Sequence, residues 1–342
     1  MRLIRFWEMN QRNGFCFVVI LLLCSFSSSQ SQHETVLDEI VTIYDKIIYD
    51  IPYVSRWCDR LGFEGQMISV AGARLYAETE GLGIPLVLLH GGPGATHHYF
   101  HPHFTRAAEF AYVIYYDQRG CGLSDYEPGG GYSIQQAAKD LDNLREALGL
   151  DEWVVLGHSY GGLLAQVYAI KYSENIAGLV LVNSPVSLNI NLEPTRQYDF
   201  LSDDEISRMQ ELRNMSDLSR EQILYNRHLN GDWKRQSYYR PSEEQLAEMV
   251  FYEWVSDPFL NSSVMRSAVQ LDLDEVFLSC RIPTLIIEGE WDLTWNTDKP
   301  GILHAQHPNA DMIILEHSGH NPFEDEPAAF FSELERFISM LD

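Results

Sequence analysis

The sequence predicts a doubly wound α/β fold with a mostly parallel sheet and an inserted helical cap. From about residue 66, short apolar runs alternate with segments that repeat apolar residues at helical spacing. One long block, residues 186–280, breaks this alternation, because it holds helix-start signals and aromatic residues but no strand-like run. We therefore expect residues 32–185 and 281–342 to form the α/β core and residues 186–280 to form the cap.

The predicted strands are read from apolar runs that end in glycine or polar residues. "QMISVAG" and "ARLYAETEG" (66–81) predict an opening hairpin. The later runs are "IPLVLLHGG", "AYVIYYDQRG", "EWVVLGHS", "GLVLVNSP", "IPTLIIEGE" and "DMIILEHSG". Unbroken apolar runs of this length are typical of strands buried on both faces of a parallel sheet.

The predicted helices are marked by capping signals and by their spacing. "SIQQAAKDLDNLREALGL" (133–150) has apolar residues at helical spacing, and "EPAAFFSELERFISML" (326–341) predicts the last helix. A serine followed three residues later by Glu or Gln indicates a capping box. Such pairs stand at Ser133 with Gln136, Ser202 with Glu205, and Ser242 with Gln245. Residues 33–62 predict an extra amphipathic helix before the sheet.

Residues 1–31 are interpreted as a secretory signal peptide. Arg2, Arg5 and Arg12 precede the apolar run "FCFVVILLLCSF" (15–26), and "SSSQSQ" follows it. The run is short for a membrane span, which needs about 20 residues. We expect cleavage near residues 29–31 and export to a periplasmic or extracellular compartment, without stable membrane insertion. Lipidation at Cys24 and an uncleaved anchor are the alternatives.

Composition limits the function classes further. The chain has 342 residues and a formal net charge of −25, which disfavours nucleic acid as a partner. The cysteines after the signal, Cys58, Cys121 and Cys280, are odd in number and far apart, so we expect buried free thiols.

The segment Gly157-His158-Ser159-Tyr160-Gly161 fits the G-x-S-x-G pattern of a strand-to-helix nucleophile turn. Four apolar residues precede it, and "LLAQVYAIKY" follows at helical spacing. Acyl transfer also needs hydrogen-bond donors for the oxyanion. We expect these from the backbone N–H groups of Tyr160 and of Gly92, which lies in "LLHGGPG" after an earlier strand.

Three motifs together resemble a known family. "HGGPG" (90–94), "DQRGCGLS" (117–124) and "GHSYGG" (157–162) are similar to the proline iminopeptidase family of α/β-hydrolases. The resemblance covers most of residues 66–185 and 281–342 and is weak across the cap. It implies a catalytic triad of Ser159 with Asp292 in "IIEGEWD" and His320 in "EHSGHNPFEDEP". No metal is implied.

Other titratable residues near these motifs are assigned lesser roles. Glu288 and Glu290 are rival acids, and His317 is a rival base. We expect His158 to orient or pack rather than to serve Ser159. His90 is expected to brace the oxyanion loop, and Asp117 and Arg119 to brace the neighbouring loops.

An aminopeptidase of this family holds the substrate's free amine with carboxylates, and here the pattern departs from the family. Leu293 and Asn261 occupy the two positions where some members have an acid. Glu253, Glu290 and Asp257 are the candidate substitutes. Trp254 is among the cap aromatic residues that are candidates for an apolar substrate pocket.

Three functions therefore stay open. The first is an exported proline iminopeptidase-like aminopeptidase that releases N-terminal proline or another small residue. The second is a carboxylesterase, lactonase or amidase on the same triad. The third is a non-catalytic binding protein, and the complete triad and oxyanion loop argue against it, because a binding protein has no need of them. We expect a small peptide, ester or amide as the substrate, and no cofactor.

The stretch "HHYFHPHF" contains His97, His98, His101 and His103. A metal site is disfavoured because the spacing shows no convincing i, i+4 helical pair with a distant third ligand. We expect these histidines to form a polar wall at the entrance of the site.

Overall fold

The computed structural model describes residues 47–56, 59–60, 62, 64–127, 131–185, 201–269, 281–292, 294 and 302–341. The predicted signal peptide lies outside these residues, as do Cys58, Cys280 and Leu293. Among the described residues, Cys121 is a buried free thiol, as expected. None of the described helices has the length and apolar character that a bilayer crossing requires.

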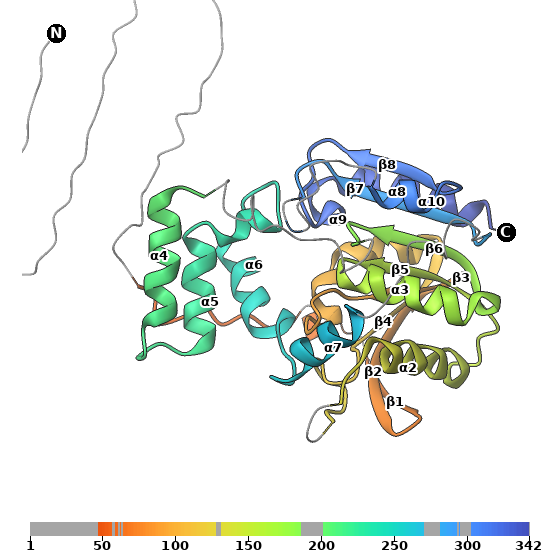
Figure 1. Ribbon diagram of the computed structural model, residues 1–342, viewed down its shortest axis with the longest axis horizontal. Coiled ribbons are helices and arrows are strands. Elements are labelled where there is room, and N and C mark those ends of the chain that lie inside the picture. The colour runs from red at the N-terminus through yellow and green to blue at the C-terminus, as the bar shows by residue number, and fades with distance from the viewer. Residues whose placement is uncertain are drawn as a thin grey trace, which may run out of the picture. The chain divides into compact units, whose positions relative to one another are not determined.

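The core is an eight-stranded sheet in the order β1-β2-β4-β3-β5-β6-β7-β8 (Figure 1). The first three strands in this order pair antiparallel, and all later neighbours pair parallel. The strands are β1 (Gln66–Val70), β2 (Ala73–Gly81), β3 (Ile84–Leu89), β4 (Ala111–Tyr116), β5 (Trp153–His158), β6 (Ile176–Val182), β7 (Thr284–Gly289) and β8 (Asp311–Leu315). The predicted fold class is confirmed.

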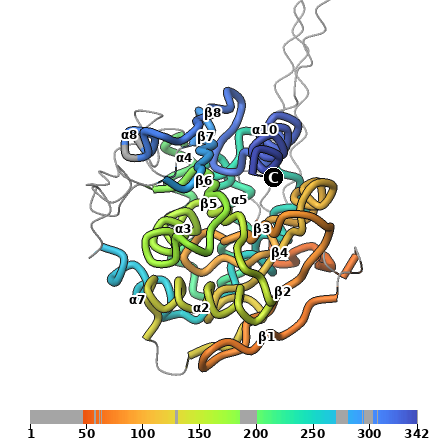
Figure 2. The backbone as a smooth tube through the Cα atoms, turned by 90° about the vertical axis from the view of Figure 1, so that its right-hand side faces the viewer, coloured from red at the N-terminus to blue at the C-terminus, as the bar shows by residue number. Residues whose placement is uncertain are grey.

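Helices cover both faces of this sheet, and α3 and α10 lie on opposite sides of the strands (Figure 2). One face carries α2 (Ile134–Ala147), α3 (Tyr160–Lys171) and α8 (Ile302–Gln306). The other carries the 3-10 helices η1 (His97–Phe100) and η2 (His103–Glu109), with α9 (Pro322–Asp325) and α10 (Pro327–Ser339). A short 3-10 turn, η3 (Ser173–Asn175), precedes β6.

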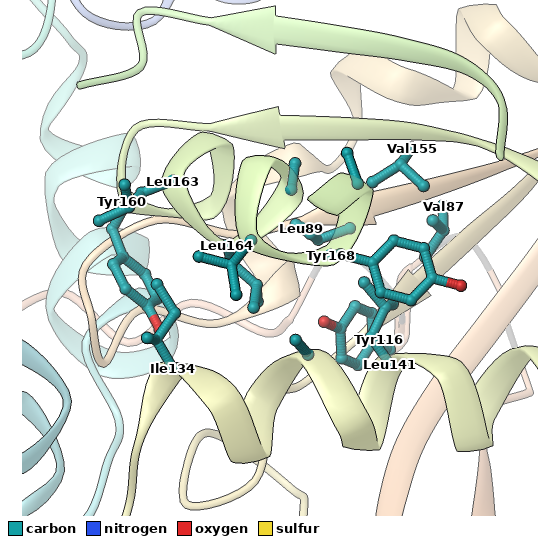
Figure 3. Packing of buried hydrophobic residues seen from close by; sticks show 14 of the residues in the cluster. Val87, Leu89, Tyr116, Ile134, Leu141, Val155, Tyr160, Leu163, Leu164 and Tyr168 are labelled. Carbon is teal, nitrogen blue, oxygen red and sulfur yellow. The ribbon is translucent and has the colours of Figure 1, made fainter. Parts of the chain in front are cut away.

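Side chains of successive strand residues enter opposite apolar clusters. Val155 packs toward α2 and α3 together with Leu164, as Figure 3 shows. Its neighbours Val154 and Leu156 pack toward η2 and α10. This alternation explains why the strands read as unbroken apolar runs, since both of their faces are buried.

The helix starts follow the capping signals with one exception. Ser202 and Ser242 form the predicted reciprocal boxes with Glu205 and Gln245. Ser133 accepts a hydrogen bond from the Gln136 backbone N at 3.2 Å, but the Gln136 side chain donates to Asp140 at 2.9 Å. The capping box predicted at the start of α2 is therefore only an N-cap, because the Asp140 carboxylate, one turn after Gln136, binds the Gln136 side-chain amide.

Between β6 and β7, the described residues 201–269 contain helices joined by turns and no strand. They form α4 (Asp203–Asn214), α5 (Arg220–Leu229), the 3-10 turn η5 (Asp232–Arg235), α6 (Glu243–Glu248), the π-helical turn η6 (Met249–Glu253) and α7 (Leu260–Ala268). The helices α4, α5 and α6 stand to one side of the sheet, and α7 lies beside α2 (Figure 1). The predicted cap is thus made of helices and turns where the chain is described.

The extra helix predicted before the sheet is wrong over residues 47–56, which have no helical backbone, whereas Asp59 and Arg60 are helical. Ile48 exchanges two hydrogen bonds of 2.8 Å with the Asn226 side amide, and Tyr252 Oη donates to the Val54 carbonyl at 2.6 Å. The apolar residues therefore pack on the cap as an extended segment. Pro52 explains the error, since proline lacks the N–H of a helix and disfavours helical backbone in the residue before it.

Candidate active site

Ser159 stands on a sharp turn between β5 and α3, with φ of 58° and ψ of −129°. The turn is closely packed, because a Cβ on Gly161 would lie 2.0 Å from the Leu89 carbonyl oxygen. A Cβ on Gly91 would likewise lie 2.9 Å from the Ser159 Cβ. The serine is therefore held in a strained conformation at the N-terminus of α3, where free N–H groups favour developing negative charge.

The structure brings His320 and Asp292 together. His320 Nδ1 lies 3.0 Å from Asp292 Oδ2, and the other carboxylate oxygen accepts a hydrogen bond from the Thr294 backbone N at 2.8 Å. Both side chains are buried. An Nδ1–H that donates to the carboxylate leaves the Nε2 lone pair able to accept a proton. The rival base His317 has a side chain that is 58% exposed.

A cavity of about 120 Å³ joins these residues to the cap. Ser159 and His320 line it from the core, and Glu253 and Trp254 line it from the cap. A larger cavity of about 650 Å³ lies between residues 49–51 and the cap, and neither Ser159 nor His320 lines it. The small cavity is therefore the place where a substrate carbonyl can meet the serine.

A chain of hydrogen bonds runs behind this cavity and was not foreseen from the sequence. The Gly91 backbone N–H donates to Tyr99 Oη at 2.6 Å, and Tyr99 Oη lies 2.9 Å from His158 Nδ1. His158 Nε2 lies 2.8 Å from the His320 backbone carbonyl, which can only accept. His158 must therefore carry its proton on Nε2, and Tyr99 must donate to Nδ1. His158 orients its neighbours, as expected.

The oxyanion loop is braced from two sides. His90 accepts from the Gln118 backbone N at 3.0 Å through Nε2, which leaves its Nδ1–H for the Gly91 carbonyl at 3.1 Å. Burial lowers the pKa of His90 to about 4, so the ring stays neutral. Asn261 donates to the Pro93 carbonyl at 3.0 Å from the cap helix α7.

Within this loop the Gly91 N–H is already engaged by Tyr99. The next residue, Gly92, lines the cavity and has φ of +118°. Tyr160 is the first residue of α3, so its N–H has no acceptor within the helix. The two predicted oxyanion donors, the N–H groups of Gly92 and Tyr160, therefore lie in the loop after β3 and at the start of α3.

A pair of carboxylates extends the cavity on the cap side. Glu253 ends the π-helical turn η6, and Glu324 lies in α9. Both line a second cavity of about 260 Å³, and Glu253 also lines the Ser159 cavity. Desolvation and then the charge of Glu324 raise the pKa of Glu253 well above its usual value. Desolvation and the charge of Asp325 raise the pKa of Glu324 to about 8.

Of the other residues predicted to contact substrate, one lines the Ser159 cavity and two do not. Trp254 lines the Ser159 cavity, whereas Glu290 is exposed and does not line it. Asp257 accepts hydrogen bonds from Tyr132 Oη at 3.1 Å and from the backbone N–H of Phe259, just before α7, at 2.8 Å. Glu253 is thus the one predicted amine anchor that the described structure places beside Ser159.

The histidine stretch does not form the polar entrance wall that the sequence predicted. The side chains of His97, His98 and His101 are buried, and only His103 is partly exposed. Burial is possible because carboxylates face the rings: His97 contacts Glu78 on β2 and Asp117 after β4, and His101 contacts Glu78.

Residues 84–327 match the family profile of the alpha/beta hydrolase fold, so the chain belongs to the α/β-hydrolase fold family and is a hydrolase. Among curated proteins, the proline iminopeptidase of Clostridioides difficile is 30% identical over 275 residues, covering 75% of this chain and 90% of the relative. That of Saccharolobus solfataricus is 28% identical over 266 residues, covering 75% and 85%. Within the fold family, the chain belongs to the proline iminopeptidase family.

The likeness to solved structures is one of fold. An esterase from Exiguobacterium antarcticum has a TM-score of 0.62 and 23% identity, covering 81% of this chain and all of the esterase. At that identity the match shows that both chains share the architecture, and the choice of substrate must be argued from the residues around Ser159.

Proposed function

We propose that this hydrolase is a serine aminopeptidase of the proline iminopeptidase type, with Ser159, His320 and Asp292 as its triad. In this mechanism His320 Nε2 takes the Ser159 proton as Oγ attacks the substrate carbonyl. Asp292 holds the opposite ring nitrogen and stabilises the imidazolium. The N–H groups of Gly92 and Tyr160 stabilise the oxyanion. His320 then protonates the leaving amine, and water releases the acyl group from Ser159.

The observation that carries this proposal is the Glu253 carboxylate in the same cavity as Ser159 and His320. Within the described residues, no hydrogen bond or ion pair reaches this carboxylate. Its raised pKa shows that no protein cation offsets its burial. A substrate ammonium group would supply the missing charge and would hold the N-terminal residue with its carbonyl beside the nucleophile. Trp254 would pack on the side chain of that residue.

The test compares wild-type protein and Ser159→Ala on three substrates: proline 4-nitroanilide, an N-acylated proline 4-nitroanilide and 4-nitrophenyl butyrate. We expect the free-amine anilide to be the best substrate, and we expect Ser159→Ala to lose nearly all turnover. Full activity of the variant would overturn the mechanism. Cleavage of the ester with neither anilide cleaved would favour the carboxylesterase, lactonase or amidase alternative, which Leu293 and Asn261 suggest.

We also propose that the protein is exported by the signal peptide interpreted in residues 1–31. Expression in a secreting host with N-terminal sequencing of the product tests this. We expect a mature chain that begins near residue 32, in the exported fraction. A product that retains Met1 would contradict the assignment.

A further inference from the structure

A second cluster of chemically active side chains lies outside the Ser159 cavity. It consists of Glu78 on β2, His97 on η1 and His101, which follows η1. All three side chains are at most 4% exposed. Their ligand atoms lie within 4.8 Å of one another. His97 and His101 are four residues apart in the chain, and Glu78 is distant in sequence. The sequence alone did not show that Glu78 lies beside the two histidines.

The distances within the cluster separate two kinds of contact. His97 Nδ1 lies 2.7 Å from Asp117 Oδ1, the length of a charge-assisted hydrogen bond. The same ring's Nε2 lies 3.4 Å from Glu78 Oε1, and His101 Nε2 lies 3.3 Å from Glu78 Oε2. Two ligands on a tetrahedral zinc ion, each at about 2.0–2.1 Å, are about 3.3–3.4 Å apart. The contacts to Glu78 have the spacing of shared ligands.

Both histidines face the same carboxylate through the same ring atom. His97 Nε2 and His101 Nε2 lie against the two oxygens of Glu78, while the opposite nitrogen of His97 lies against Asp117. One nitrogen of each ring is thus turned toward Glu78, where a single ion can contact all three side chains.

The surroundings resemble those of a metal ligand set. Asp117 also accepts a hydrogen bond from the His97 backbone N at 2.9 Å, which fixes the ring's position. Tyr76 Oη donates to Glu78 Oε1 at 2.6 Å. The ring of His101 stacks on Tyr115 with a centroid distance of 4.1 Å. Carboxylates and hydroxyls that orient ligating side chains in this way are typical of zinc sites.

Charge balance points the same way. Glu78 and Asp117 place two carboxylates in a buried site, where uncompensated negative charge is costly. A divalent cation neutralises both. His101 also lines the 260 Å³ cavity, which offers an entry path.

We propose that Glu78, His97 and His101 bind one zinc ion, with Asp117 as the group that orients His97. All three ligands lie outside the Ser159 cavity, so the role of the ion is structural. It would tie β2 to η1, the segment after the oxyanion loop, and so brace that loop.

The test is zinc content and stability of the full chain. Protein stripped with a chelator and reloaded with zinc should retain one equivalent after desalting, and its Tm should rise with added zinc. Cobalt in place of zinc should give the visible absorption of a tetrahedral site. Glu78→Gln and His101→Ala should lower zinc affinity at least tenfold. The matched control His98→Gln, a buried histidine of the same helix, should keep wild-type affinity.

The cobalt and Tm measurements use wild-type protein, so they decide the matter even if a variant fails to fold. No retained metal, no cobalt absorption and no shift in Tm would overturn the proposal and leave a histidine–carboxylate ion cluster. Zinc lost in Glu253→Gln but kept in Glu78→Gln would also overturn it, since the ion would then belong to the carboxylates of the Ser159 cavity.

Discussion

Two pairs of carboxylates in this hydrolase lie in different electrostatic surroundings. Glu78 and Asp117 are buried and contact histidines of the same fold. Glu253 and Glu324 line one cavity, and the pKa of each is raised. His103 Nε2 lies 3.6 Å from Glu324, but burial lowers the pKa of this ring to about 4, so at neutral pH it offers no charge.

The difference teaches where ligands are expected. A carboxylate that is paired with histidines, and in our proposal with a structural zinc ion, contributes to structure, and its removal should disturb loops. A carboxylate left to hold a proton is costly to bury, and a cationic ligand can replace that proton. The Glu253 pair is therefore the place where substrate charge should matter most.

The largest expected effect comes from removing this charge. Glu253→Gln should lower kcat/KM for proline 4-nitroanilide by about ten- to 150-fold, because a hydrogen bond to a charged group contributes about 1.5–3 kcal/mol. The rate on 4-nitrophenyl butyrate should change little. Glu290→Gln, an exposed acid outside the cavity, is the matched control. Equal losses on both substrates would mean that Glu253 shapes the site rather than binding the amine.

The next largest effect is expected in how the free energy of unfolding depends on pH, which should distinguish the Glu324 pair from the Glu78 pair. The pKa of Glu324 is raised from 4.5 to about 8, so between these pH values the unfolded chain releases a proton that the folded chain keeps. Stability from this group therefore falls as pH rises through that window and levels off above it. Because 21% of the side chain is exposed, we expect Glu324→Gln to gain only about 1–3 kcal/mol at pH 8. The variant should gain nothing near pH 4.

Urea unfolding at several pH values measures this change, with the exposed Glu335→Gln as the control. If the variant keeps the same slope of stability against pH as the wild type, the Glu324 carboxylate is ionised throughout and the comparison between the two pairs fails.

The smallest effect is expected at Tyr99, which lines both cavities. Tyr99→Phe removes the acceptor of the Gly91 N–H and the donor to His158, at a cost of about 1 kcal/mol. We expect kcat to fall about fivefold on anilide and ester alike with KM nearly unchanged. A change in KM for the free-amine substrate alone would place Tyr99 in amine binding instead of in positioning.

The sequence predicted those features that depend on residues close together in the chain. The strand pattern, the glycine-flanked Ser159 and the motifs around Asp292 and His320 depend on neighbours in the chain, and the structure brings the last two within 3.0 Å. The parallel pairing of the later strands also follows from the alternation of strands and helices, because parallel strands need crossover connections.

What sequence reasoning missed depends on contacts between distant segments. Glu324, only four residues after His320, carried no signal, because its meaning comes from Glu253 on another element. The burial of His97 likewise depends on Glu78, a strand residue read only as part of a hairpin. Pro52 argued against a helix before the sheet, but the helical prediction gave more weight to the spacing of the apolar residues, and this was wrong.

The π-helical turn Met249–Glu253 has a consequence for how this protein's selectivity can change over evolutionary time. Such a turn holds one residue more than an α-helix would, and Glu253 is its final residue. Deleting one residue there would remove the extra residue and let the segment close as an ordinary α-helical turn, so the side chains within it would point in new directions. Glu253 would then turn away from the cavity while Ser159, His320 and Asp292 stayed in place. A single codon lost from the gene would thus remove the proposed amine anchor and leave the proposed triad intact.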